Sequence, residues 1–191
     1  SANGMTTPTP VAALTVAEIA DMSPGTLTEA MTQLPQFYSS ATAANFNSAG
    51  NGFFTSAGGG SLNLRGIGAK RTLTLLDGRR IVSSSINGGP DINTFPGSML
   101  RTVESVTGGA SAAYGTDAVS GVVNYILDTD FTGLRGQVQM GQTSRADGDN
   151  SELSLSFGTK LGDRAHLLLS AEHFEQDAIS TFEGRDWYQG W

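Results

Sequence analysis

Residues 108–127 read GGASAAYGTDAVSGVVNYIL, and this stretch decides the fold. Gly108 and Gly109 permit a sharp turn with positive φ, a conformation that residues with a Cβ atom resist. The small residues that follow predict a short helix ending at Tyr114, and Gly115 provides its C-terminal stop. So many small residues in so few positions indicate that backbones approach one another closely here.

The second half of the stretch predicts a further turn and a buried strand. Thr116 and Asp117 are expected to cap the turn. Gly121 then opens the run 122–127, whose β-branched and apolar residues are typical of a buried strand. A phosphate-binding loop is the alternative for such a glycine-rich turn. A close-packing turn is favoured, because the sequence contains neither G-x-G-x-x-G after a strand nor G-x-x-x-x-G-K-[ST].

The composition favours a β-rich or outer-membrane chain over a soluble cytoplasmic enzyme. Only 15% of the 191 residues are charged, and 25 are glycine. The net charge of −7 disfavours binding to a phosphate backbone, so we expect no nucleic-acid partner. The chain has no cysteine, which excludes disulfides and Cys-ligated zinc. No apolar run approaches the roughly 18 residues of a transmembrane helix, but alternating barrel strands escape this test.

Two short amphipathic helices are predicted near the N-terminus, each opened by a capping box. The first box is Thr15–Glu18, and its helix is expected to end at about Met22. The second box is Thr26–Glu29, and Pro35 stops its helix. Both helices need a sheet or another layer against which to bury their apolar faces.

The middle of the chain predicts short strands separated by polar turns. Ser61–Arg65 is expected to be an alternating strand. Residues 72–82 carry the clearest hairpin signal, because Asp77 and Gly78 suit a two-residue type I′ turn. Residues 102–106 are expected to form another short strand.

Two polar, glycine-rich stretches read as loops, at residues 37–60 and 83–89. Loops as long as the first are usually functional or mobile. Its three phenylalanines, Phe46, Phe53 and Phe54, either contact a ligand or anchor the loop to its own domain.

After Leu127 the pattern changes to long alternating strands. The apolar positions that share one face of these strands are Leu134, Gly136, Val138 and Met140, then Leu153, Leu155 and Phe157, then Ala165, Leu167, Leu169 and Ala171. Strands of about ten residues with one apolar and one polar face are typical of an outer-membrane barrel. A soluble sandwich is the alternative, although its strands are usually shorter.

Residues that could catalyse a reaction or bind a metal form no recognisable set. His166 and His173 are an odd number of residues apart and would face opposite sides of a strand. Residues 147–150 resemble part of a calcium loop but lack its other ligands, so a solvated acidic loop is favoured. No G-x-S-x-G elbow occurs. We therefore expect no enzymatic activity, no metal and no cofactor.

A basic cluster surrounds the predicted hairpin and consists of Arg65, Lys70, Arg71, Arg79 and Arg80. Such clusters are usually solvated faces. The alternative is ion pairing with an acidic barrel lining, where partial desolvation would offset part of the attraction.

Residues 108–127 resemble the end of the plug domain of TonB-dependent outer-membrane receptors, which closes with a pattern like GGASAxYGxDAxxGVVNxI. Residues 64–68 and 71–80 are similar to the family's R-G-x-G followed by L-x-L-x-D-G-R-R. Residues 96–109 are similar to P-x-x-x-I-E-R-V-E-V-x-x-G-G. The resemblance covers about residues 8–182.

The resemblance implies an α+β fold in two parts. A small mixed-sheet plug domain with short helices would occupy residues 1–128. The first antiparallel strands of a transmembrane β-barrel would occupy residues 129–191. Because such receptors close barrels of roughly 22 strands and this chain supplies about three, we expect a piece of a longer receptor.

The function implied by the resemblance is TonB-dependent active transport across the bacterial outer membrane, with the plug inside the barrel. The receptor would bind a scarce or bulky siderophore, vitamin or oligosaccharide and admit it by plug rearrangement. Implied partners are the TonB-ExbB-ExbD energy-transducing complex, outer-membrane lipid and the substrate, with the TonB-engaging segment expected upstream of Pro8. A stand-alone plug-like module for ligand binding or signalling is the alternative.

The resemblance also implies two groups of site residues. Apical plug loops at residues 46–60 and 83–91 are expected to contact substrate, through Phe46, Phe53, Phe54, Asn87 and Asp91. The family's lock between plug and barrel implies roles for Arg65, Arg101 and Glu104. The family's Glu-Arg pair reads Arg101-Thr102 here, so the second arginine of the lock is displaced by one residue.

Overall fold

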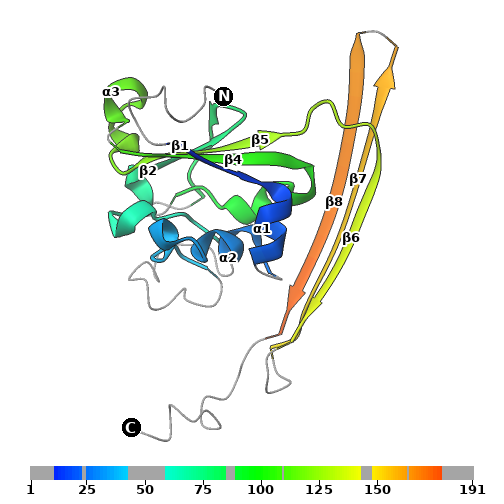
Figure 1. Ribbon diagram of the computed structural model, residues 1–191, viewed down its shortest axis with the longest axis horizontal. Coiled ribbons are helices and arrows are strands. Elements are labelled where there is room, and N and C mark those ends of the chain that lie inside the picture. The colour runs from blue at the N-terminus through cyan, green and yellow to red at the C-terminus, as the bar shows by residue number, and fades with distance from the viewer. Residues whose placement is uncertain are drawn as a thin grey trace, which may run out of the picture.

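Two β-sheets organise the chain, a five-stranded mixed sheet and a three-stranded antiparallel sheet that stands beside it (Figure 1). The computed structural model describes residues 11–22, 25–42, 59–84, 89–108, 110–142, 148–162 and 164–177.

The mixed sheet has the strand order β1-β4-β5-β2-β3. Its strands are β1 (Val11–Thr15), β2 (Thr72–Leu76), β3 (Arg79–Arg80), β4 (Leu100–Thr107) and β5 (Gly121–Leu127). The pairing of β2 with β5 is parallel, and the other three pairings are antiparallel. The strand nearest the N-terminus, β1, is an edge strand that pairs with β4 alone.

Short helices cover the mixed sheet. The α-helices are α1 (Val16–Met22), α2 (Leu27–Thr32) and α3 (Ser111–Tyr114). The 3-10 turns are η1 (Pro35–Phe37), η2 (Leu64–Gly66), η3 (Ala69–Arg71), η4 (Ile92–Thr94), η5 (Gly97–Met99) and η6 (Thr116–Ala118). In Figure 1, α1 and α2 lie together on one side of the sheet. None of the helices that the structure describes has the length and apolar character needed to cross a membrane.

Both predicted capping boxes are confirmed. The Glu18 carboxylate accepts hydrogen bonds from the backbone N–H and the hydroxyl of Thr15, each at 2.7 Å. The Thr26 hydroxyl accepts from the Glu29 N–H, and the Glu29 carboxylate accepts from the Thr26 N–H. These bonds satisfy backbone donors that a helix start otherwise leaves unpaired.

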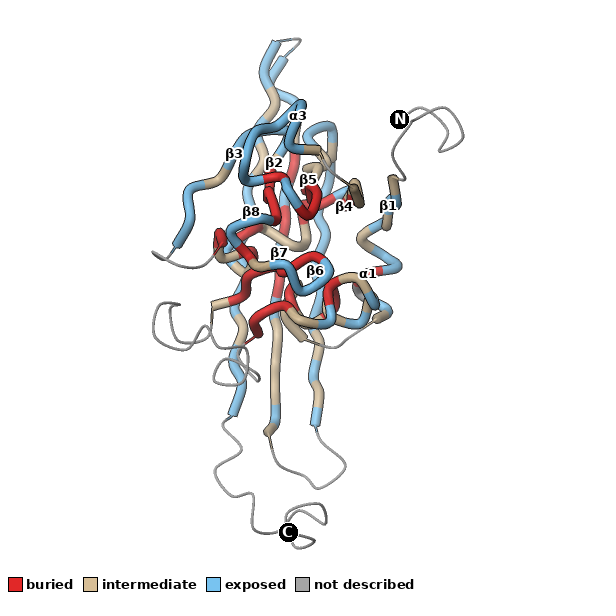
Figure 2. Tube along the Cα trace, turned by 90° about the vertical axis from the view of Figure 1, so that its left-hand side faces the viewer, coloured by how far each residue is buried: buried red, intermediate tan, exposed pale blue. Residues whose placement is uncertain are grey.

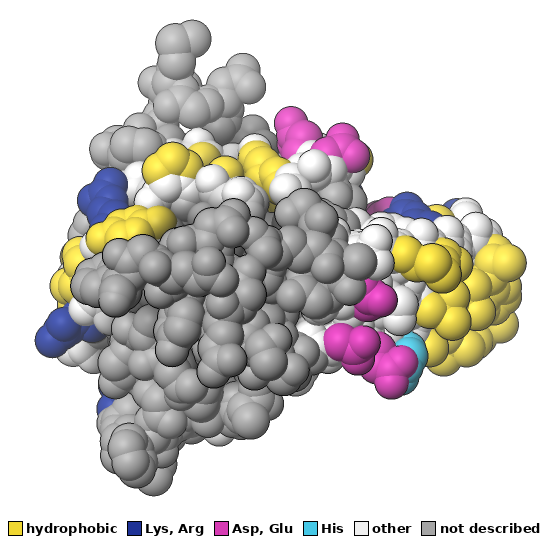
Figure 3. Space-filling model, turned by 90° about the horizontal axis from the view of Figure 1, so that it is seen from below, with side chains coloured by type: hydrophobic (Ala, Val, Ile, Leu, Met, Phe, Trp, Pro, Cys, Tyr) yellow, Lys and Arg dark blue, Asp and Glu magenta, His cyan; other side chains and the backbone are white. Residues whose placement is uncertain are grey.

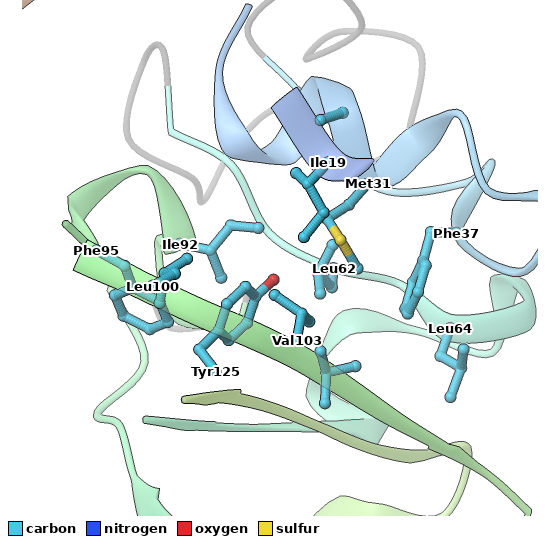
Figure 4. Packing of buried hydrophobic residues seen from close by; sticks show 12 residues of the cluster. Ile19, Met31, Phe37, Leu62, Leu64, Ile92, Phe95, Leu100, Val103 and Tyr125 are labelled. Atoms are coloured by element: carbon cyan, nitrogen blue, oxygen red, sulfur yellow. The ribbon is translucent and has the colours of Figure 1, made fainter. Parts of the chain in front are cut away.

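The main core lies between the mixed sheet and the layer of α1, α2 and the loops beside them (Figures 2 and 4). It contains Ile19, Ala30, Met31, Phe37, Leu62, Leu64, Ile92, Phe95, Leu100, Val103, Val123 and Tyr125. A smaller cluster uses the opposite face of the sheet and contains Leu73, Leu75, Ala118 and Val122. Apolar clusters therefore cover both faces of the sheet, and α1 and α2 bury their apolar faces against one of them, as expected for amphipathic helices.

The stretch 108–127 folds largely as its sequence predicts. Gly108 has a φ of 138° and Gly115, which ends α3, has a φ of 88°. A Cβ atom on Gly121 would overlap the Val106 carbonyl oxygen of β4, which confirms the close approach of backbones. The expected capping of the next turn is wrong, because Gly115 is the N-cap of η6 and no side chain caps it. Asp117 instead forms an ion pair with Arg80, at 2.6 Å.

The predicted hairpin is confirmed, because Asp77 and Gly78 have φ values of 48° and 74°, both positive as a type I′ turn requires. The predicted strand at Ser61–Arg65 is wrong. Only Ser61 forms a strand-like pair, with Ala41, and the chain then turns into η2. Side chains rather than a neighbouring strand satisfy the backbone of this segment.

Two such bonds hold the segment. The Asn63 N–H donates to the Ser40 hydroxyl at 2.9 Å, and the Leu64 N–H donates to the Thr72 hydroxyl at 2.9 Å. Leu62 and Leu64 still share the buried face that the alternation indicated.

The antiparallel sheet consists of β6 (Gly133–Gly141), β7 (Asn150–Leu161) and β8 (Ala165–Gln176), in that order. Its register places apolar residues opposite apolar residues, as in the pairs Leu134–Phe157 and Leu155–Ala171. These side chains point away from the mixed sheet and gather on an exposed apolar face (Figure 3).

The side-chain alternation of the three long strands is therefore confirmed. His166 pairs with Lys160, whereas His173 pairs with Leu153 on the apolar face. The two histidines lie on opposite faces, as predicted.

Candidate functional site at the contact between the two sheets

The contact between the two sheets is centred on Ser98 in the turn η5. The Ser98 N–H donates to a Glu172 carboxylate oxygen at 2.7 Å. The Ser98 hydroxyl lies 2.6 Å from the Ser156 hydroxyl, and the Ser98 carbonyl accepts from the Arg135 guanidinium at 2.9 Å. Arg135, Ser156 and Glu172 belong to β6, β7 and β8 respectively, so each strand of the antiparallel sheet binds one polar group of the same residue.

The covalent connection between the sheets lies next to this turn. The Asp128 N–H, just after β5, donates to the Met99 carbonyl of η5 at 2.8 Å. Arg135 approaches the Asp128 carboxylate at 3.8 Å and lies 4.5 Å from the centre of the Phe131 ring. The turn, the connection and the start of β6 therefore form one bonded cluster.

A cavity of about 480 Å³ separates the two sheets beside this cluster. From the mixed-sheet side it is lined by Thr26, Leu27, Asn93, Phe95 and Gly97. From the antiparallel sheet it is lined by Glu152, Glu172, Phe174 and Gln176. The cavity thus combines the two aromatic rings and one leucine with polar side chains, two of them carboxylates.

A smaller cavity of about 70 Å³ continues the separation between α1 and α2 and the strands β6 and β7. Val16, Ile19 and Ala30 line one side, and Gln137 and Ser154 line the other. The helices therefore face the antiparallel sheet across unfilled space, whereas η5 is bonded to it.

The three predicted lock residues all lie on the mixed-sheet part. Arg65 is exposed in η2 with a φ of 60°. Arg101 is exposed at a register shift in β4, and Glu104 is half-buried further along the same strand. Among the described residues, none of the three forms an ion pair with the antiparallel sheet.

The predicted substrate residues are only partly placed. Asp91 is described, and its carboxylate accepts from the Gly60 N–H at 2.9 Å and from the Asn93 N–H at 3.1 Å. It joins two loops beside the large cavity. The other four, Phe46, Phe53, Phe54 and Asn87, lie outside the described residues.

The basic cluster around the hairpin binds partly within its own domain. Arg80 pairs with Asp117 and also donates to the Tyr114 carbonyl. Arg71 donates to the Ile67 carbonyl at 2.8 Å. These contacts favour an internal role for the two arginines over pairing with the neighbouring strands.

The described residues contain no group of three or more His, Asp or Glu side chains that could hold a metal ion. The alternation of the strands put Ser156 and Glu172 on the polar face, but nothing in the sequence marked Ser98 as their partner. Residues 98 and 172 meet only when the chain folds, so pattern reading missed this contact.

The sequence matches the family model described as "TonB-dependent Receptor Plug Domain" over residues 3–122. Among solved structures, the chain is similar to the siderophore receptor PirA from Pseudomonas aeruginosa, with 22% identity and a TM-score of 0.61. It is also similar to a mutant of the ferric enterobactin receptor PfeA from the same organism, with 21% identity and a TM-score of 0.67. A third match is the ferric yersiniabactin uptake receptor FyuA from Yersinia pestis, with 18% identity and a TM-score of 0.58.

These alignments include most of this chain but a minor part of each matched structure. They cover 91% of this chain and 30% of PirA, and 91% of this chain and 25% of PfeA. The FyuA alignment covers 92% of this chain and 25% of that receptor. The fold shared with them is a mixed-sheet domain with short helices followed by the first strands of a β-barrel.

Proposed function

The chain belongs to the family of TonB-dependent receptor plug domains, and we propose on that premise that it supplies the plug and first barrel strands of an outer-membrane active transporter. The plug occupies residues 1–128 and the barrel wall begins at residue 129. The observation that carries the proposal is the orientation of β6–β8, with apolar side chains outward and polar side chains toward the plug.

The outward apolar face supports a position in lipid. Leu134, Val138 and Met140 of β6 are 71%, 65% and 78% exposed, far more than a water-soluble fold leaves uncovered along one strand. With 12 residues each, β7 and β8 exceed the roughly 9–11 residues that a tilted strand needs to cross a bilayer. Since an open strand edge cannot face lipid, further strands complete the barrel around the plug.

The inward polar contacts support a plug that is held but can rearrange. Ser98 is bound by hydrogen bonds rather than by a continuous apolar interface, and the cavity of about 480 Å³ leaves space beside it. Replacing such a hydrogen bond by hydrogen bonds to water costs little net free energy, typically about 1 kcal/mol for each bond and more where a partner is charged. The energy for rearrangement comes from the TonB-ExbB-ExbD complex, which acts on the N-terminal side of β1.

The substrate is a scarce or bulky nutrient, and a siderophore is the first class to test, because the matched structures include receptors for siderophores. Vitamins and oligosaccharides are the other two classes. The residues proposed to contact it are those of the apical loops, Phe46, Phe53, Phe54, Asn87 and Asp91. Arg65, Arg101 and Glu104 are proposed to pair with barrel residues beyond β8.

The test is uptake by cells that carry the intact receptor, with and without TonB, against a panel of ferric siderophores, cobalamin and oligosaccharides. We expect TonB-dependent uptake of one class. Replacing Phe53 and Phe54 by alanine should lower substrate binding about ten-fold or more. The control variant Tyr38→Ala, which removes an exposed ring from the turn after η1, should leave binding unchanged. Binding without uptake in the presence of TonB would instead indicate the stand-alone binding or signalling module.

A further inference from the structure

The two loops proposed to bind substrate are joined to one small region of the plug. Residues 43–58 and 85–88 lie outside the described residues, but the residues that flank them are described. Ala41 and Ser61 exchange two backbone hydrogen bonds of 3.0 Å, so the flanks of the first loop lie side by side. A Cβ atom on Gly89, which follows the second loop, would lie 3.8 Å from the Ser61 Cβ. Both loops therefore leave the plug from a common base.

The carboxylate of Asp91 bonds the flanks of the two loops to each other. One of its oxygens, Oδ1, accepts from the Gly60 N–H at 2.9 Å and from the Asn93 N–H at 3.1 Å. The Ile92 N–H donates to the Gly60 carbonyl at 2.9 Å. Both backbone polar groups of Gly60 are thus bonded to the segment that follows the second loop. A charged acceptor makes the bonds of Asp91 stronger than bonds between neutral groups.

The helix α2 holds this arrangement from the core side, through Thr28. The hydroxyl and the N–H of Thr28 donate to the Asn93 side-chain oxygen at 2.7 Å and 3.3 Å. Thr28 is fully buried, so it has no surface with which to contact a substrate. A Cβ atom on Gly60 would overlap the Thr28 hydroxyl oxygen. The helix, the end of the first loop and the turn η4 are therefore packed with no space between them.

We propose that Thr28, Asp91 and Asn93 form a loop clamp that fixes the two substrate loops relative to each other, and that Asp91 serves substrate binding as a positioning residue. This inference rests on the proposed function, because that function makes these loops the substrate site. Segments that are held in one arrangement before the substrate arrives lower the ordering cost that binding has to overcome. Loss of the loop clamp therefore weakens binding even where no contact with the substrate is removed.

The test measures substrate affinity and TonB-dependent uptake separately in the intact receptor. The probe is the ferric siderophore, cobalamin or oligosaccharide that the unmodified receptor takes up. Thr28→Val keeps the side-chain shape but removes the hydroxyl, and should raise Kd about five-fold, as expected for one lost hydrogen bond. Asp91→Ala should raise Kd about ten-fold or more, because it removes two bonds to a charged acceptor. The maximal uptake rate at saturating substrate should stay within about two-fold, since the TonB-driven step is untouched.

Two matched variants separate positioning from direct contact and from general destabilisation. Asp91→Asn keeps an accepting oxygen and should bind within about three-fold of the unmodified receptor. Thr32→Val removes a hydroxyl from the same helix, where it donates to the Glu29 carbonyl, and should leave Kd unchanged. The loop clamp is refuted if Thr28→Val leaves Kd unchanged, or if Asp91→Asn loses as much affinity as Asp91→Ala. A fall in maximal uptake with an unchanged Kd would also refute it.

Hydrogen exchange gives a readout that needs no substrate and so separates the two proposals. Because the Gly60 N–H donates to Asp91, Asp91→Ala should accelerate exchange at Gly60 about ten-fold or more, whereas Thr32→Val should not change it. Equal exchange at Gly60 in Asp91→Ala and in the unmodified receptor would overturn the loop clamp. If the unmodified receptor takes up no compound of the panel, the proposed function fails, whatever the exchange at Gly60 shows.

Discussion

The replacement Gly121→Ala tests the close contact between the two central strands of the plug. Gly121 has a φ of 145°, and a Cβ atom there would overlap the Val106 carbonyl oxygen and lie 2.6 Å from a Leu64 methyl group. Backbone strain at such a φ costs on the order of 1–3 kcal/mol. Overpacking against a fixed backbone costs on the order of 1–3 kcal/mol more. We therefore expect a loss of about 4 kcal/mol in the free energy of unfolding of the plug.

A second glycine separates the two contributions. Gly78 also has a positive φ, of 74°, but nothing lies within 4 Å of the position of its Cβ. Gly78→Ala should therefore cost only the backbone term, about 1–2 kcal/mol. The assay is hydrogen exchange of peptides from β4 and β5 across a urea series, which reports the local free energy of opening. If Gly121→Ala costs no more than Gly78→Ala, the argument from close packing is refuted.

Three further predictions follow from single side chains. The Tyr125 hydroxyl is buried without a hydrogen-bond partner among the described residues, and burial raises its pKa. Because an unpaired buried hydroxyl costs free energy, Tyr125→Phe should stabilise the plug by about 1 kcal/mol, measured by thermal unfolding. A lower unfolding midpoint for the variant would mean that the hydroxyl has a partner. Hydrogen bonds from the Thr15 N–H, which has the larger effect, and from the Thr15 hydroxyl lower the pKa of the Glu18 carboxyl. The ionised carboxylate therefore stabilises the folded plug fully above the ordinary carboxyl pKa of about 4.3, and this stabilisation is lost as pH falls through the lower pKa of the folded state. Glu18→Gln should flatten this acid dependence of stability, and an unchanged acid limb would contradict the capping box. Both side chains of the Arg80–Asp117 ion pair are about half exposed to solvent. Asp117→Asn should therefore lower the free energy of unfolding by less than about 1 kcal/mol at low ionic strength, and by still less in 0.5 M salt. A larger loss of stability that salt does not reduce would show that solvent does not screen the pair.

Local structure was largely predictable because its determinants lie within a few residues of one another. The capping boxes at Thr15 and Thr26 and the turn at Asp77 follow from side chains that bond to neighbouring backbone groups. The exception, the strand expected at Ser61–Arg65, failed for a non-local reason. Hydroxyl groups of Ser40 and Thr72 satisfy its backbone, and no pattern within the segment reveals them.

The candidate site was harder to predict than the fold. The family resemblance pointed to Arg65, Arg101 and Glu104 for the contact with the wall, and these stay proposals. The contact that the structure contains uses Ser98, whose backbone groups carry two of its three bonds. Backbone groups leave no signature in a sequence, because every residue except proline has both.

The sequence by itself determined the side-chain alternation of the barrel-wall strands, the capped starts of the helices and the glycine turns of the stretch 108–127. These features depend on chain periodicity and on local bonding, which are properties of neighbouring residues. Only the tertiary structure decided which turn of the plug meets the wall and where space remains between them. Ser98 and Glu172 are far apart along the chain, and their meeting depends on how the two sheets pack, a geometry that no local pattern encodes.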